Sequence, residues 1–222
     1  MKTGAMRAAL FAAAALAAAA QALGDPGQVF IADYLNPGLA PAHWVLTIRP
    51  DGSGHFRSER GDAAMDASAG FQAANVDRDI HVSAEFAGRV FDTVHKFKNL
   101  NLDCESHMKV AFQGWKKLTY SGPDGKGSCT FNYSKDKEIE SLGESLVAVS
   151  ETIVEGARLE VLLQHDRLGL DREMENLVES AGDGRAQQIC TIRGILQRLA
   201  DDPAVMDRVR KRARVLLART EG

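Results

Sequence analysis

The chain has 222 residues, of which 45% are hydrophobic and 26% charged, and its formal net charge is −3. This composition is typical of a soluble globular protein and excludes collagen-like, coiled-coil-only and wholly disordered chains. No stretch of about 18 or more apolar residues occurs, which excludes a polytopic membrane protein. The length allows one domain or two small ones.

The N-terminus has the pattern of a cleaved secretory signal. Lys2 and Arg7 supply positive charge, Ala8–Ala20 is an apolar run, and Ala20-Gln21-Ala22 is the small-x-small pattern that a signal peptidase reads. The run is shorter than the roughly 20 residues that a membrane-spanning helix needs. We therefore expect residues 1–22 to be a signal peptide. Its short, alanine-rich form indicates a bacterial protein that is periplasmic or secreted.

Residues 23–134 have the alternation and turn chemistry of an antiparallel β-sheet. Apolar and polar side chains alternate over 44–48, the segment 50–54 is rich in turn-forming residues, and 55–58 reads as the returning strand. Residues 28–34 predict a further strand, which we expect at an edge of the sheet. One apolar and one polar face is the pattern of a sheet that is solvated, or covered by a partner, on one side.

A second hairpin is predicted over residues 117–133, with its turn at 122–125. Val110 and Phe112 suggest one more strand directly before it. The glycine-rich turn superficially resembles a phosphate-binding loop. Because no helix follows to hold a phosphate, we interpret it as a turn only.

A helix is predicted between the two hairpins. Ser83 is a good N-cap, and the residues after it form an apolar stripe wide enough to lie across the sheet: Phe86, Val90, Phe91, Val94 and Phe97. The stretch from Glu59 to Val76, rich in Gly, Ala, Asp and Ser, predicts a long loop. A loop of this length is uncommon unless it is functional or disordered.

Helical periodicity dominates the remainder of the chain. We expect one long helix from about Asp136 that ends before Gly169, a short helix capped by Asp171, and another helix over 189–199. Asp202-Pro203 reads as an N-cap followed by proline at the first position of a last helix.

These patterns predict an α+β fold, with an N-terminal antiparallel β-sheet carrying one packed helix, followed by an all-helical C-terminal half. The predicted organisation is a signal peptide (1–22), a β-rich α+β domain (23–134) and a helical C-terminal region (135–222). Whether the helical region is a separate domain stays open at this stage.

The three cysteines are interpreted first as a disulfide and a leftover thiol. In an oxidising compartment two of three cysteines commonly pair, although sequence alone does not give the connectivity. We favour Cys104 with Cys129, because both lie in the β-rich part. Cys190 would then remain as a small buried residue between Ile189 and Ile192.

The alternative is a thiol- or metal-dependent hydrolase centred on Cys104 and His107, with His95 or the acidic predicted helix assisting. Zinc accepts such ligands, and a Cys–His pair can make a thiolate nucleophile. A structural zinc site needs four ligands in paired spacings, however, and only one short pair is present. We therefore expect no metal, no cofactor and no catalytic set.

Acidic side chains are frequent on the long predicted helix: Glu138, Glu140, Glu144, Glu151, Glu155 and Glu160. Paired acids can perform acid–base chemistry only if burial shifts the pKa of one of them. Since no pocket-forming aromatic residues are interleaved with them, we interpret them as a solvated helix face.

The last predicted helix is strongly basic instead: Arg208, Arg210, Lys211, Arg212 and Arg214. Cations near a helix C-terminus are favoured by the helix dipole, which explains part of the cluster. The functional alternative is peripheral contact with an anionic membrane surface or an acidic partner.

Two classes of function remain. The first is a non-catalytic binding or interaction protein of the bacterial cell envelope, whose partner is an envelope protein or a ligand. The second is the small hydrolase centred on Cys104 and His107. We favour the first, because no nucleophile, base and orienting group can be identified together. A mildly acidic chain has no overall electrostatic reason to bind nucleic acid.

Overall fold

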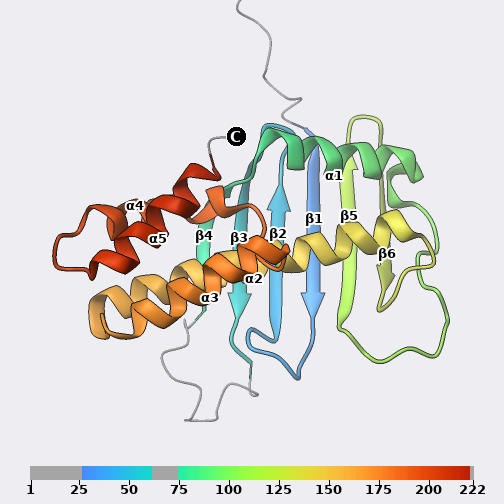
Figure 1. Cartoon of the computed structure of the whole chain (residues 1–222). Coiled ribbons are helices and arrows are strands. Elements are labelled where there is room, and N and C mark those ends of the chain that lie inside the picture. The colour runs from blue at the N-terminus through green and yellow to red at the C-terminus, as the bar shows by residue number, and fades with distance from the viewer. Residues whose placement is uncertain (1–26, 62–74, 221–222) are drawn as a thin grey trace, which may run out of the picture.

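Six antiparallel strands form the N-terminal half of the fold in the computed structural model, which describes residues 27–61 and 75–220 (Figure 1). Their order in the sheet is β4-β3-β2-β1-β5-β6. The strands are β1 (Val29–Leu35), β2 (His43–Ile48), β3 (Ser53–Glu59), β4 (Asp77–His81), β5 (Trp115–Gly122) and β6 (Gly125–Phe131).

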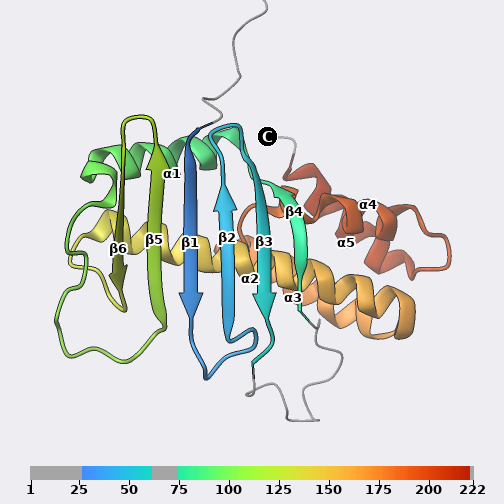
Figure 2. The same ribbon diagram turned by 180° about the vertical axis from the view of Figure 1, so that it is seen from behind.

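The helices are α1 (Ala84–Lys96), α2 (Lys137–His165), α3 (Gly169–Asp183), α4 (Arg193–Asp201) and α5 (Asp207–Ala218), with short 3-10 helices η3 (Lys98–Leu100) and η4 (Ile189–Ile192). Helices α1 and α2 cross one face of the sheet, α3 runs back along the second half of α2, and α4 and α5 lie beyond the β4 edge (Figures 1 and 2). The predicted α+β fold, with an N-terminal sheet and a helical C-terminal half, is confirmed.

Alternation along the strands separates a buried face from an open one. On β2, the side chains of Trp44, Leu46 and Ile48 are buried, as predicted, whereas those between them are only half-buried. Of the described elements, none lies over the second face (Figure 2). The predicted hairpins β2–β3 and β5–β6 are both confirmed.

Two strand predictions are wrong. Strand β1 lies in the centre of the sheet, paired with β2 on one side and with β5 on the other, and not at an edge. The alternation of a strand does not show how many neighbours it has, because pairing with β5 depends on a distant segment. Val110 and Phe112 belong to an irregular segment before β5 and not to a strand.

Helix α1 forms as its sequence predicts. The Ser83 hydroxyl accepts a hydrogen bond from the backbone N–H of Phe86 at 3.2 Å, which caps the helix. The buried side of α1 carries Phe86, Val90 and Val94, which lie in the core under the sheet.

Helix α2 joins two hydrophobic cores. Six of its buried side chains belong to the core between the sheet and α1: Ile139, Leu142, Leu146, Val149, Ile153 and Ala157. Leu159, Leu162 and Leu163 belong to a second core with α3, α4 and α5. The predicted boundary at residues 134/135 coincides with the turn before α2, but the first part of α2 packs on the sheet.

Two helix starts differ from the prediction. Helix α3 begins at Gly169, so Asp171 lies in its first turn and is not its cap. Helix α5 begins at Asp207 and not at Asp202-Pro203. The Asp202 carboxylate accepts a hydrogen bond from the N–H of Ala204 at 2.8 Å, which stabilises a turn after α4 in place of a helix N-terminus.

Two predictions concern residues outside those that the structure describes, namely the signal peptide over 1–22 and most of the loop between Glu59 and Val76. Within residues 27–61 and 75–220, no helix is long and apolar enough to cross a membrane.

Gly156 lies on α2 at the point where the helix passes from the first core to the second, and it packs against Ile192. A Cβ atom at this position would lie 2.3 Å from Cγ2 of Ile192, whereas a Cβ atom at Gly182 would meet nothing within 4 Å. Although alanine has the higher helix propensity, we expect G156A to lower the free energy of unfolding by about 1–3 kcal/mol through overpacking. The control G182A should be neutral or slightly stabilising. Urea denaturation measures the free energy of unfolding of both variants. Equal effects of G156A and G182A would contradict a tight contact between Gly156 and Ile192.

Candidate functional site

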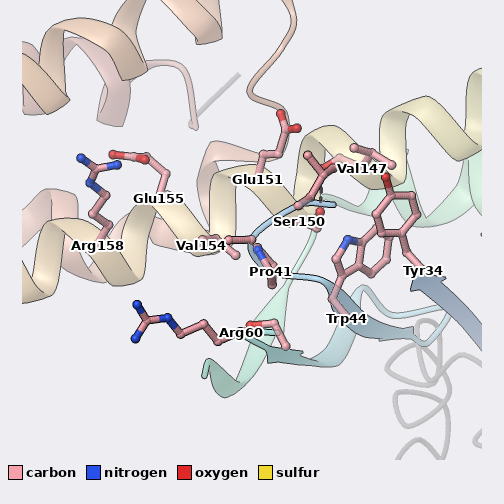
Figure 3. A pocket seen from close by; sticks show the side chains of 13 residues that line it. Tyr34, Pro41, Trp44, Arg60, Val147, Ser150, Glu151, Val154, Glu155 and Arg158 are labelled. Atoms are coloured by element: carbon pink, nitrogen blue, oxygen red, sulfur yellow. Dashed lines mark hydrogen bonds between the residues drawn. The ribbon is translucent and has the colours of Figure 1, made fainter. Parts of the chain in front are cut away.

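A pocket opens between the middle of α2 and the sheet, where β1 ends and β2 begins (Figure 3). Its volume is about 290 Å³. We call it the α2 pocket. Its apolar end is lined by Tyr34, Pro41, Trp44, Val147 and Val154, its polar end by Glu155 and Arg158, and its rim by Arg60 and Glu151.

The aromatic residues of the apolar end are held rigidly. The rings of Tyr34 and Trp44 stack with their centroids 5.1 Å apart. The Tyr34 hydroxyl donates a hydrogen bond to the carbonyl of Gln113 at 2.7 Å. Gly114 has a φ of +106°, and a Cβ atom there would lie 2.5 Å from the Tyr34 ring. Only glycine therefore permits this close approach of the chain to Tyr34.

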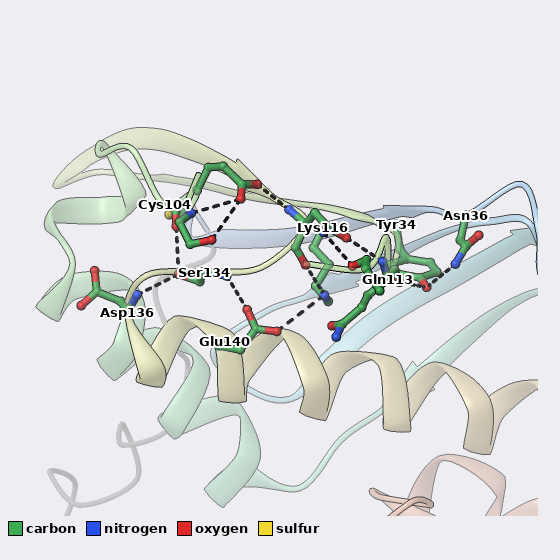
Figure 4. A network of polar contacts seen from close by, with 12 residues as sticks. Tyr34, Asn36, Cys104, Gln113, Lys116, Ser134, Asp136 and Glu140 are labelled. Carbon is green, nitrogen blue, oxygen red and sulfur yellow. Dashed lines mark hydrogen bonds and ion pairs between the residues drawn. The ribbon is translucent and has the colours of Figure 1, made fainter. Parts of the chain in front are cut away.

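A polar network fixes the segment that holds Tyr34 (Figure 4). The Glu105 carboxylate accepts from the N–H of Asn132 at 2.7 Å. The Asn132 side chain accepts from the N–H of Gln113 at 2.7 Å and donates to the carbonyl of Ala111 at 3.1 Å. The irregular segment before β5 is thus tied to the end of β6, and Tyr34 is tied to that segment.

The same network contains a buried ion pair at the start of α2. The Lys116 ammonium donates to the carbonyl of Asn132 at 3.0 Å and lies 3.8 Å from the Glu140 carboxylate. Burial lowers the pKa of Lys116, and the attraction of Glu140 opposes that effect. Glu140 also accepts from the N–H of Ser134. This pair anchors α2 to β5 beside the pocket.

At the polar end of the pocket, Glu155 and Arg158 both interact with Glu173 of α3. The Arg158 guanidinium forms an ion pair with Glu173 at 3.0 Å. Burial raises the pKa of Glu155 to about 8, and the neighbouring carboxyl group of Glu173 adds to the effect. Glu155 is therefore protonated at neutral pH, when it can donate a hydrogen bond to the Glu173 carboxylate.

Two atoms at this end are buried and have no hydrogen-bond partner within the described residues. They are Oε1 of Glu155 and Nε of Arg158. Buried polar atoms are nearly always paired with protein, water or a ligand. Because both atoms are closed off from solvent, a molecule in the pocket could reach them only after side chains move.

The predicted disulfide is confirmed: Cys104 is bonded to Cys129, and Cys190 is free. Cys190 is only half-buried, and its Sγ lies 3.5 Å from the carbonyl oxygen of His81. Burial raises the pKa of its thiol, which makes Cys190 a poor nucleophile at neutral pH.

The thiol chemistry considered for Cys104 is excluded by this bond, because Cys104 has no thiolate to offer. His107 is exposed and pairs with Asp103 at 3.2 Å, whereas His95 lies 3.3 Å from Asp124. The three residues therefore form no nucleophile–base set. Among the residues that the structure describes, no group of three or more His, Cys, Asp or Glu side chains could hold a metal ion.

The cations of the last helix have partners inside the molecule. Arg208 and Arg212 each lie 2.6 Å from the carboxylate of Asp171 on α3, and Lys211 lies 2.8 Å from Asp207. Arg210 also contacts Asp207, at 3.2 Å, and Arg214 donates to a backbone carbonyl of α4 at 2.9 Å. An anionic membrane would have to compete with these contacts, so membrane binding by α5 stays a prediction.

The interpretation of the acidic residues of α2 as a solvated face is wrong for two of them. Glu140 is buried, and Glu155 lies at the polar end of the pocket. The sequence contains a signal for Glu155 that periodicity can show: it shares a helical stripe with Ala148, Thr152, Leu159 and Leu162, all of which are buried. That stripe is the second buried side of α2, in addition to the side that faces the sheet.

Comparison with known protein families and with curated proteins finds no match to this chain.

The protonated state of Glu155 has a consequence for stability. The pKa of this group is about 8 in the folded protein against an ordinary value of 4.5. The folded state therefore binds more protons between these pH values, and the free energy of unfolding should fall as the pH rises. We expect urea denaturation at pH 5.5 and pH 8 to show a fall of at least about 1 kcal/mol.

E155Q should flatten this pH dependence, because glutamine does not ionise. E144Q, on the exposed side of α2, should not change it. His55, whose pKa is raised by its hydrogen bond to Asp79, adds a slope of the same sign in all variants. The difference between variants is therefore the informative quantity, and an E155Q slope equal to that of the wild type would contradict a protonated Glu155.

Proposed function

We propose that this chain is an exported, non-catalytic binding protein of the bacterial cell envelope, and that it holds a small ligand in the α2 pocket. The signal pattern of residues 1–22 supports export to the periplasm or secretion. The Cys104–Cys129 disulfide is compatible with an oxidising compartment.

The observation that carries the binding function is the division of the α2 pocket into two ends. Stacked aromatic rings and aliphatic side chains line one end, and a few convergent polar groups, one with a strongly raised pKa, line the other. Small-molecule sites typically have this combination of apolar walls and few polar groups. The sheet and the disulfide-bonded segment hold the walls in place without a ligand.

Binding is a better explanation of the pocket than catalysis. Covalent catalysis requires a nucleophile within hydrogen-bond reach of a base. The hydroxyl groups that line the α2 pocket already have other partners: that of Ser150 donates to the carbonyl of Val147 at 2.7 Å, and that of Ser58 accepts from the N–H of Val76 at 3.2 Å. Glu155 is directed to Glu173. We therefore assign no catalytic residue.

Pocket occupancy is testable with the amphipathic dye anilinonaphthalene sulfonate. The chain has two tryptophans, so in a W115F background Trp44 becomes the only tryptophan reporter, and it lines the pocket. We expect the dye to quench Trp44 fluorescence saturably. V154F should fill the apolar end and weaken dye binding by roughly tenfold or more. V215F, at a half-exposed valine of α5, is the matched control and should bind as the parent does. Equal binding by V154F would refute the pocket as the site.

Export is tested separately by the N-terminus of the protein recovered from a bacterial periplasmic fraction. Cleavage after Ala22 predicts a mature chain that starts at Leu23. Alkylation of the unreduced, denatured protein should modify one cysteine, Cys190, since the other two are bonded. An intact N-terminus on cytosolic protein with three reactive thiols would contradict the assignment to the envelope.

A further inference from the structure

Exposed apolar side chains gather where β1 ends and β5 begins, at the lower end of the sheet in Figure 2. Of the eight large apolar side chains that are exposed among the described residues, six come from this end, which we call the apolar end: Leu35, Leu39, Met108, Val110, Phe112 and Trp115. Leu35 pairs with Trp115 across the two strands, and the rings of Phe112 and Trp115 meet edge to face with their centroids 6.1 Å apart. Single exposed apolar residues are ordinary on a protein surface, whereas a contiguous group marks a contact site.

The segment that carries most of the apolar end, residues 106–114, is irregular but held in place. The backbone N–H of Ser106 donates to the carbonyl of Tyr133 at 2.9 Å, and the Asn132 side chain binds the backbone on both sides of Phe112. These bonds tie the backbone to the end of β6, whereas the side chains of Met108 and Phe112 remain 65% and 51% exposed. The fold therefore presents apolar side chains to the solvent from a fixed backbone.

The charge around the apolar end is positive. Residues 106–117 contain three lysines and no aspartate or glutamate. Lys116 is buried, whereas Lys109 and Lys117 are exposed, and Lys117 lies on the same face of β5 as Trp115. Within the part of the chain that the structure describes, neither of the two exposed lysines forms an ion pair.

Carboxylates beside the apolar end have other partners. Asp103 lies 3.2 Å from the ring nitrogen of His107. Asp33 is opposite Lys117 in the register of β1 and β5, but its carboxylate is hydrogen-bonded to His43 at 2.9 Å. The ammonium groups of the two exposed lysines are thus left for an anionic group outside the chain.

A lipid surface explains this combination better than a protein partner does. Lysine is depleted from protein–protein interfaces. At the surface of a bilayer, Trp and Phe lie at the level of the headgroups, and lysine lays its aliphatic stem along apolar surface while its ammonium group stays among the headgroups. Exposed apolar side chains beside lysines are therefore typical of a surface that lies on a membrane without spanning it.

We propose that the apolar end is a membrane-contact surface for a bilayer that contains anionic phospholipid. Met108, Phe112 and Trp115 enter the boundary between headgroups and acyl chains, and the ammonium groups of Lys109 and Lys117 pair with lipid phosphates. This contact goes beyond the proposed ligand-binding function and does not require an occupied α2 pocket.

The fluorescence of Trp115 is the direct readout. The full chain is mixed with vesicles of equal parts phosphatidylcholine and phosphatidylglycerol whose acyl chains carry bromine atoms as quenchers. We expect the vesicles to quench the wild-type protein. W115F should show no quenching, because the other tryptophan, Trp44, is only 4% exposed. Equal quenching of W115F and the wild type would contradict insertion of Trp115.

The apolar contact is tested by M108Q/F112Q, which replaces two exposed side chains and leaves the core intact. We expect this variant to bind the vesicles roughly tenfold or more weakly in a sedimentation assay, because it removes apolar area from the contact. L168Q, at an 80% exposed leucine between α2 and α3, is the matched control and should bind as the wild type does.

The charge contact is tested by K109Q/K117Q. We expect about tenfold weaker binding to the mixed vesicles, and no change on phosphatidylcholine alone, since each lysine near an anionic surface adds to the affinity. R208Q/K211Q on α5 is the matched control. Its cations are already paired with carboxylates of the protein, so it should bind as the wild type does.

The outcomes separate this surface from its alternatives. Absence of Trp115 quenching in the wild type, or unchanged binding by both M108Q/F112Q and K109Q/K117Q, overturns the proposal. If R208Q/K211Q alone weakens binding, α5 is the membrane contact instead. If the protein forms a dimer without vesicles that M108Q/F112Q dissociates, and Trp115 is not quenched, the apolar end is a protein interface. Dye binding to the α2 pocket is measured without vesicles, so each of these failures leaves the pocket proposal standing.

Discussion

Helix α2 is buried on two sides, and this constraint organises the rest of the structure. A helix of 29 residues gains most of its stability from packing and little from intrinsic propensity. Here one stripe of α2 closes the core beneath the sheet, and a second stripe closes the core formed by the C-terminal helices. The α2 pocket lies where the helix leaves the sheet, because there neither core fills the space beside it.

Buried charge along α2 is compensated in two different ways. Near its start, Lys116 and Glu140 remain an ion pair that is supported by backbone hydrogen bonds. Farther along, two carboxyl groups share one guanidinium, so one of them, Glu155, keeps its proton. Removing one partner of a buried pair is usually far more costly than the net value of the pair. Both arrangements therefore constrain the surrounding sequence strongly, and among the described residues each leaves one buried carboxyl oxygen without a hydrogen-bond partner, Oε1 of Glu140 and Oε1 of Glu155.

Local patterns in the sequence were sufficient for much of the fold. Both predicted hairpins, the Ser83 cap of α1 and the disulfide follow from alternation, turn chemistry and the position of two cysteines in one region. The central position of β1 did not follow, because its second neighbour, β5, is distant in the sequence. The α2 pocket was missed for a similar reason: its aromatic end comes from the strands, and its polar end comes from a helix whose second buried stripe was interpreted as solvated.

The central place of β1 also bears on the order in which the chain can fold. Strands β1 to β4 are a continuous meander, so they can pair with one another before the later strands are synthesised. The other edge of β1 stays unpaired until β5 arrives, because Leu35 pairs with Trp115. Such a non-local pairing is slow to form, and it leaves an open strand edge that can associate with other chains. Until β5 is synthesised, the middle strand of the final sheet therefore has one unpaired edge.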